Sequence, residues 1–176
     1  IRGEVSISGS KNAALPILAA TLLFDKNVTI KNLPRVKDID TMLNLLKSLG
    51  KKISFKNNKK IATISKGKKN NFFAPYSLVK TMRAGILVLG PLLAKNKKAK
   101  VSSPGGCSIG VRPIDIHLKA ISKLGVKMQI EKGYVNAKAQ DGLIGSEIRF
   151  SKISVGATEN SILAACLAKG TTTIKN

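Results

Sequence analysis

The sequence predicts an α/β fold built from repeated βαβαββ units. Two observations support this fold class: an internal repeat, and apolar patterns that change period from strand to helix within each copy. Residues 39–55 resemble residues 114–130, with Asp40 matching Asp115 at an offset of 75 residues. Such a repeat indicates that one supersecondary unit recurs along the chain.

A second repeated element has three copies. Residues 22–32 resemble residues 167–176, and residues 92–103 form a middle copy about one repeat from each. The chain therefore holds two units and the beginning of a third, which starts near residue 147.

The first unit follows from local signals. EVSIS alternates as a half-buried strand does, a small polar loop leads into an apolar helix, and a second strand follows. Acidic residues then open an amphipathic helix that Gly50 ends, and a hairpin closes the unit. The expected elements are, in order, 4–8, 12–24, 27–32, 38–50, 51–55 and 61–65.

The second unit is expected to contain one long apolar helix over 77–94, a glycine-rich loop with a cysteine, a helix over 114–125 and a hairpin over 126–139. In the third unit, residues 150–161 form a passage from strand to helix.

Composition excludes several classes of protein. Hydrophobic residues make up 43% of the 176 residues, which excludes a disordered chain, and no apolar run is long enough to span a membrane. Two cysteines do not indicate a disulfide framework. One histidine and two distant cysteines do not match the spacing of zinc ligands. Without an apolar signal core near residue 1, a reducing cytoplasm is the expected setting.

The net charge of +22 is the strongest compositional signal. It leaves open a basic nucleic-acid-binding module, because such proteins carry excess cationic charge. The lysines are nevertheless spread over turns and helix faces and are not interleaved with aromatic residues, so a solvated surface is the favoured interpretation.

Candidate functional residues cluster where helices begin. Lys11 and Asn12 lie between a strand and a helix, where backbone amides and a mobile ammonium favour phosphate or carboxylate. Arg83, expected mid-helix, and Arg112, just before a helix start, offer a planar fork to the same groups. Lys152 and Ser154 lie in a third such passage.

Cys107 lies in a glycine-rich loop between Lys100 and Arg112. Neighbouring cations favour the thiolate, so this residue is a candidate nucleophile or general acid, although an incidental surface thiol remains an alternative. Cys166, within an apolar helix, is interpreted as a small buried side chain. His117 is assigned a structural or surface role.

Four motifs together resemble the family of UDP-N-acetylglucosamine 1-carboxyvinyltransferases. They are GSKNAALP, LVKTMRAG, PGGCSIGVRPIDIHL and SVGAT, and the resemblance runs through essentially the whole chain. One such motif is weak, but four in this order are specific. The resemblance implies two similar domains, each built from three βαβαββ units around buried helices as an inside-out α/β barrel.

The resemblance also implies a reaction. Phosphoenolpyruvate would donate its enolpyruvyl group to the 3-hydroxyl of UDP-N-acetylglucosamine with release of phosphate, the first committed step of peptidoglycan synthesis. These small molecules are the only partners implied, with no cofactor, no metal, no membrane and no specific nucleic acid. Fosfomycin would alkylate Cys107.

Site residues follow from the matching positions. The resemblance implies that Lys11 and Asn12 bind phosphoenolpyruvate, that Cys107 is the general acid, and that Arg83 and Arg112 stabilise charged groups. Lys11 and Arg112 would act in catalysis beside Cys107. The implied nucleotide-binding residues are Arg112, Pro113, Ile114, Asp115 and Ile116, together with Lys152, Ile153, Ser154 and Val155.

The implied domain arrangement limits what this chain can do. Residues 1–176 would form one domain bearing the cysteine loop, with an incomplete third unit, and the second domain would be absent. Because the family's general base, an aspartate, and a further substrate arginine lie in that second domain, we expect residues 1–176 alone to be inactive.

Three competing readings remain. They are the related enolpyruvyl transferase of the shikimate pathway, which is not expected to carry the loop cysteine, a basic nucleic-acid-binding module, and the RNA 3′-phosphate cyclase family.

Overall fold

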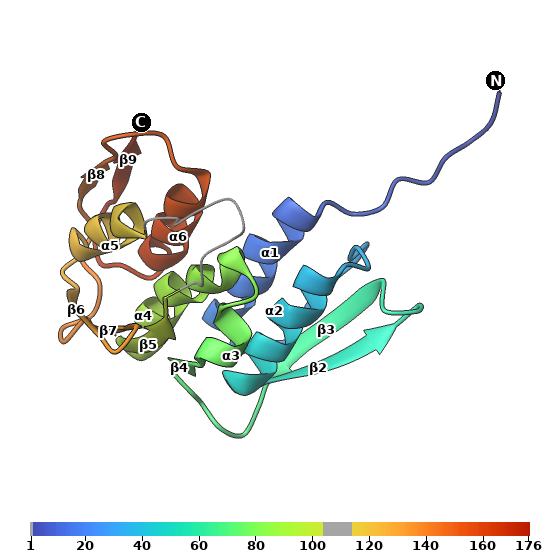
Figure 1. The fold of residues 1–176 in the computed structure, drawn as a ribbon, viewed down its shortest axis with the longest axis horizontal. Helices are drawn as coiled ribbons and strands as arrows, with labels where there is room; N and C mark the ends of the chain where they lie inside the picture. Colours follow the sequence, from blue (N-terminus) through green and yellow to red (C-terminus); the bar gives the residue numbers. More distant parts are fainter. Residues whose placement is uncertain (1, 104–113) are drawn as a thin grey trace.

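The computed structural model describes residues 2–103 and 114–176. Helices lie in the middle of the molecule and three small sheets lie around them (Figure 1). The buried aliphatic side chains of helices and strands form one continuous core. Each repeated unit contributes a sheet that covers one apolar face of the helices, so the units share this core.

The first unit forms a three-stranded antiparallel sheet in the order β1-β3-β2, with helices packed on one face. The observed hairpin agrees with the predicted one to within a residue. The elements are α1 (Lys11–Ala20), η1 (Thr21–Leu23), β1 (Val28–Ile30), α2 (Lys37–Ser48), β2 (Lys51–Lys56) and β3 (Ile61–Lys66).

The second unit forms a four-stranded sheet in the order β4-β5-β7-β6, in which β4 and β5 are parallel. Its elements are β4 (Phe73–Ala74), α3 (Tyr76–Val79), η2 (Arg83–Val88), α4 (Leu89–Asn96), β5 (Lys98–Ser102), α5 (Asp115–Ser122), β6 (Lys127–Glu131) and β7 (Tyr134–Lys138).

The third unit contains β8 (Glu147–Arg149), α6 (Val155–Ala165) and β9 (Thr173–Lys175). Strands β8 and β9 pair in parallel. Helix α6 packs against α4 and α5, so the third unit joins the same helical core.

The structure confirms the internal repeat. Strand order β1-β3-β2 in the first sheet recurs as β5-β7-β6 in the second. Gly50 and Gly125, which match in the repeat, follow α2 and α5 with φ values of +99° and +84°. Glycine adopts this left-handed conformation without steric cost, and in both units it follows the helix at the same repeat position.

The predicted strand over 4–8 is wrong. Residues 2–10 have no regular secondary structure, and Val5 and Ile7 are 82% and 79% exposed. Figure 1 shows this segment leading away from the rest of the molecule. Alternation makes a segment able to form a strand, but its amide and carbonyl groups need a partner strand, and none among the described residues pairs with it.

The single helix predicted over 77–94 is also wrong, because the chain forms three short helices there. Met82 is extended, and the chain folds back so that a Cβ on Gly85 would lie 3.0 Å from Cγ1 of Val79. A continuous helix would also need an amide at Pro91, which has none. Beginning α4 at Leu89 places Pro91 in the first turn, where proline is tolerated.

The interpretation of Cys166 as a buried residue is wrong as well. Helix α6 ends at Ala165, and both Cys166 and the following Leu167 are exposed. Apolar composition predicted the helix correctly but not which of its residues face outward. Within residues 2–103 and 114–176, no helix is both long and apolar enough to cross a membrane.

Candidate functional site

A hollow of about 660 Å³ lies where several helices begin. Its lining includes the first residues of α1 and η2, the residues at the start of α5, and the residues around the start of α6. Unpaired amides in the first turn of a helix carry partial positive charge. Their convergence makes this hollow suited to an anionic ligand.

Helix α1 contributes Lys11 and Asn12. Its N-cap is Ser10, whose hydroxyl accepts a hydrogen bond from the Ala13 amide at 3.3 Å. This cap starts the helix directly before Lys11, and both Lys11 and Asn12 line the hollow. The Lys11 ammonium lies 2.9 Å from Asp38 at the start of α2, and both side chains are partly exposed.

Arg83 is the first residue of η2 and is exposed on the wall of the hollow. The predicted helix is interrupted here, because the extended backbone at Met82 separates α3 from η2 and makes Arg83 the first residue of a new helix. Arg83 and Lys11, which are 72 residues apart in the chain, thereby line one hollow.

Helix α6 contributes the third helix start. The Ser154 hydroxyl accepts a hydrogen bond from the Ala157 amide at 3.3 Å, the same cap that Ser10 makes on α1. Ile153 and Val155 beside it are 81% and 70% exposed. Two apolar side chains left in water at the rim of a polar hollow provide a surface on which a flat, partly apolar ligand group could lie.

His117 is buried in the wall and is held by Asn160, which is fully buried. The Gly90 amide donates to Asn160 Oδ1 at 2.8 Å, which fixes the orientation of the side-chain amide. Asn160 Nδ2 therefore donates to the Ile86 carbonyl at 3.0 Å and to His117 Nδ1 at 3.3 Å. Because Nδ1 accepts, the proton of the neutral ring is on Nε2.

Burial, with a smaller contribution from the positive charge of Arg83, lowers the pKa of His117 to about 4. The ring is therefore neutral at pH 7. A neutral imidazole with its proton on Nε2 can donate a hydrogen bond to a ligand in the hollow without carrying charge.

This arrangement predicts a pH-dependent stability. Between pH 4 and the unfolded-state value near 6.5, the unfolded chain binds a proton at His117 that the folded chain does not. Stability should fall by up to about 3 kcal/mol as the pH is lowered through this window. Urea midpoints measured from pH 4 to 7 test this expectation, and His117→Gln should remove most of the slope. An equal slope in that variant would contradict the assignment.

The hollow brings together many of the residues singled out in the sequence. Asp115 and Ile116 begin α5 but do not line it, since Asp115 points to Lys119 and Ile116 packs on the core. Lys152 lies on the same loop as its neighbours but is not part of the lining. Cys107, Arg112 and Pro113 lie outside the described residues. The predicted residues that line the hollow are Lys11, Asn12, Arg83, Ile114, Ile153, Ser154 and Val155.

Sequence reasoning missed three polar residues of the hollow: Asp38, His117 and Glu159. Asp38 and His117 both occupy the first turn of a helix, so the reasoning that selected Lys11 would have found them if applied to every helix start. Burial raises the pKa of Glu159 above its usual value. No sequence signal distinguishes Glu159, which reaches the hollow only because α6 packs beside α1.

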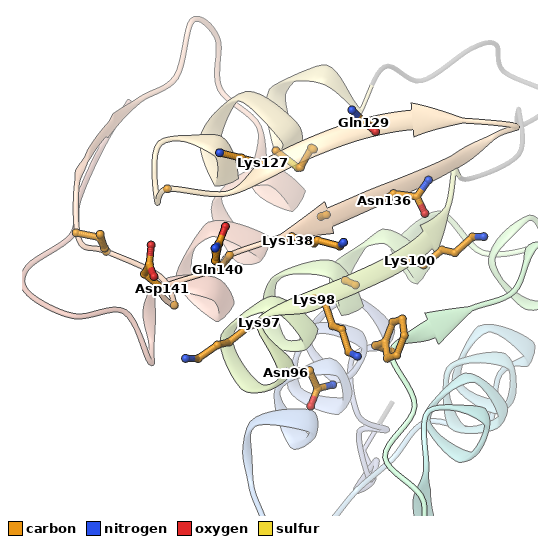
Figure 2. A pocket seen from close by; sticks show the side chains of 18 of the residues that line it. Asn96, Lys97, Lys98, Lys100, Lys127, Gln129, Asn136, Lys138, Gln140 and Asp141 are labelled. Carbon is orange, nitrogen blue, oxygen red and sulfur yellow. The ribbon is translucent and has the colours of Figure 1, made fainter.

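A larger open hollow of about 1110 Å³ lies on the outer face of the β5-β7-β6 sheet (Figure 2). It is rich in lysine and contains none of the residues predicted to form the site. Over the two described ranges, no three His, Cys, Asp or Glu side chains are placed to hold a metal ion.

A family model described as EPSP synthase (3-phosphoshikimate 1-carboxyvinyltransferase) matches residues 1–176. Curated relatives named UDP-N-acetylglucosamine 1-carboxyvinyltransferase are 66% identical in Pelagibacter ubique and 55% identical in Helicobacter pylori over all 176 residues. The chain spans 42% of the length of each of these relatives.

Solved structures share the fold. The enolpyruvyl transferase NikO from Streptomyces tendae superposes with a TM-score of 0.81 at 20% identity, over 98% of this chain and 40% of that one. An EPSP synthase from Acinetobacter baumannii gives a TM-score of 0.68 at 19% identity over the same shares. The α/β fold predicted from the repeat is thereby confirmed.

Proposed function

Because the chain belongs to the EPSP synthase family, we propose that it forms part of an enzyme that transfers the enolpyruvyl group of phosphoenolpyruvate to the 3-hydroxyl of UDP-N-acetylglucosamine, releasing phosphate. The observation that carries the proposal is the hollow in which Lys11, Arg83 and several helix starts converge. The names of the relatives most similar in sequence support this acceptor.

Both proposed substrates are anions. In our assignment Lys11 and Asn12 hold phosphoenolpyruvate at the start of α1, and Arg83 balances the charge that develops as phosphate leaves. The rim formed by Ile153, Ser154 and Val155 takes part of the nucleotide, since it combines a capping hydroxyl with exposed apolar side chains.

The remaining roles rest on the motifs alone. We assign Cys107 as the general acid that protonates the methylene carbon, with Arg112 beside it. We further propose that the nucleotide is bound by Lys152 and by the segment formed by Arg112, Pro113, Ile114, Asp115 and Ile116. The product would be a peptidoglycan precursor, which places the protein in cell-wall synthesis in the cytoplasm.

The relatives extend well beyond the length of this chain, and we propose that a second domain supplies the rest of the site. The isolated 176 residues should therefore release no phosphate. A chimera in which residues 1–176 replace the matching part of the Pelagibacter ubique relative is the suitable test protein, because the two sequences are 66% identical over that region.

The test is phosphate release by this chimera from phosphoenolpyruvate with either UDP-N-acetylglucosamine or shikimate 3-phosphate. We expect release with the UDP-sugar alone, and none from a Cys107→Ser variant. Release with shikimate 3-phosphate would assign the acceptor named in the description of the matching family model. A folded chimera that releases no phosphate with either acceptor would overturn the proposal. Turnover by the isolated chain would overturn the requirement for a second domain.

A further inference from the structure

Three lysines on three neighbouring strands lie in one row on the outer face of the second sheet. Lys138 on β7 is paired directly with Lys98 on β5 and with Lys127 on β6. All three side chains are exposed and line the large hollow shown in Figure 2. Directly opposed residues of an antiparallel pair have Cβ atoms about 5 Å apart, so the three lysine side chains start from a row about 10 Å long.

Such a row is unfavourable unless an anion balances it, because like charges placed directly opposite each other destabilise a sheet. Among the described residues, none of the three lysines takes part in an ion pair. Glu131 and Asp141 also line the hollow, but neither is paired with a lysine over the same ranges.

Elsewhere the chain balances neighbouring lysines with a carboxylate. Asp25 accepts from Lys95 and lies 3.0 Å from Lys66, and the hydrogen bond from Lys95 is the main cause that lowers the pKa of Asp25 to about 2. With nine acidic residues against 31 basic ones, the lysine row has no such partner from the described chain.

The first unit shows that the fold does not require this row. At the matching place in the first sheet, Lys52 on β2 is opposite Ser65 on β3. Asn27 precedes β1 directly beside that pair, because the next residue, Val28, is opposite Ile64. The row therefore holds one lysine in the first unit and three in the second.

The aromatic residues beside the row are already covered. The Lys98 ammonium lies 4.2 Å from the centroid of the Phe72 ring, and the Lys100 ammonium lies over both Phe73 and Tyr134. Cation–π contacts of this kind occupy the ring faces on which bases of single-stranded nucleic acid would stack. The surface therefore favours an anion that binds through charge and hydrogen bonds and does not stack on aromatic rings.

We propose that the row formed by Lys98, Lys138 and Lys127 is a binding site for a free oligophosphate, a linear anion of three or more phosphate groups. Its charge matches the three ammonium groups, and Lys97 and Lys100 extend the positive surface of the same hollow. Polar amide side chains of Gln129 and Asn136 form the adjacent row and can donate further hydrogen bonds. This site is separate from the hollow at the helix starts and does not depend on the proposed function.

The test is a titration of the 176-residue chain with inorganic triphosphate. Calorimetry measures the affinity, and changes in the NMR chemical shifts of the backbone amides locate the site. We expect shifts on β5, β6 and β7. Lys138→Ser, which reproduces the row of the first unit, should weaken binding at least about tenfold, since several phosphate contacts depend on the central charge. Lys56→Ser removes an exposed lysine from the other sheet and should leave binding unchanged.

A second readout follows from the repulsion itself. At low ionic strength without phosphate, Lys138→Ser should melt at a higher temperature than the parent, and triphosphate should raise the melting temperature of the parent only. Lys11→Met should bind triphosphate as the parent does, which excludes binding at the helix starts. The proposal would be overturned if Lys138→Ser and Lys56→Ser weakened triphosphate binding equally. It would also be overturned by amide chemical-shift changes confined to the helix starts, or by tighter binding of oligo-dT than of triphosphate.

Discussion

Replacing Lys11 with methionine in the chimera is expected to lower kcat/KM for phosphoenolpyruvate by roughly 100- to 1000-fold, the range found when one preorganised donor is removed from an active site. Methionine keeps an unbranched side chain that is one atom shorter and removes the charge. Lys11 is the first residue of α1 and lines the hollow, where its ammonium adds to the positive field of the helix start. Steady-state phosphate release measures the effect.

Two variants separate this role from a structural one. Lys37→Met removes a neighbouring exposed lysine at the start of α2 that does not line the hollow, and it should retain full activity. Asp38→Asn breaks the ion pair with Lys11 but leaves the ammonium in place, so most of the activity should remain. If Asp38→Asn lost as much activity as Lys11→Met, the ion pair rather than the free cation would be the functional feature.

Replacing Asn160 with leucine is expected to lower the free energy of unfolding by about 4 kcal/mol. Asn160 joins three separate parts of the core through the Gly90 amide, the Ile86 carbonyl and the His117 ring. Leucine would leave the Gly90 amide and His117 Nδ1 without these bonds, whereas the Ile86 carbonyl keeps the Leu89 amide as a donor. Each buried unsatisfied group costs about 1–3 kcal/mol. Urea unfolding of the chain measures the change.

The matched control for Asn160 is the next residue. Ser161 is equally buried, but its hydroxyl donates to the Ala157 carbonyl of its own helix at 2.8 Å. Ser161→Ala should therefore cost about 1 kcal/mol, the usual net value of one hydrogen bond. A loss in Asn160→Leu no larger than this would mean that the three bonds do not hold the helices together. A Cβ on Gly90 would lie 2.6 Å from Asn160 Oδ1, so glycine is required for this contact.

Local pattern was sufficient wherever an element depends on its own residues. The amphipathic helix ended by Gly50, its repeat ended by Gly125, and both hairpins occur as predicted, since periodicity and turn chemistry act over a few residues. The repeat extended these local predictions to a second unit, and the structure then showed the same strand order in both sheets. The motifs likewise singled out Lys11, Arg83 and Ser154, which the structure places on the lining of one hollow.

Tertiary contacts decided the remainder. The segment over 4–8 alternates like a strand but has no pairing partner among the described residues, and the apolar run over 77–94 folds back at Gly85 on Val79. His117 became part of the site because Asn160, from a helix 43 residues further along, holds its ring beside Arg83. Periodicity indicates which face of a helix is apolar, whereas burial, pairing and pKa depend on groups distant in the sequence, and only the packed chain brings those together.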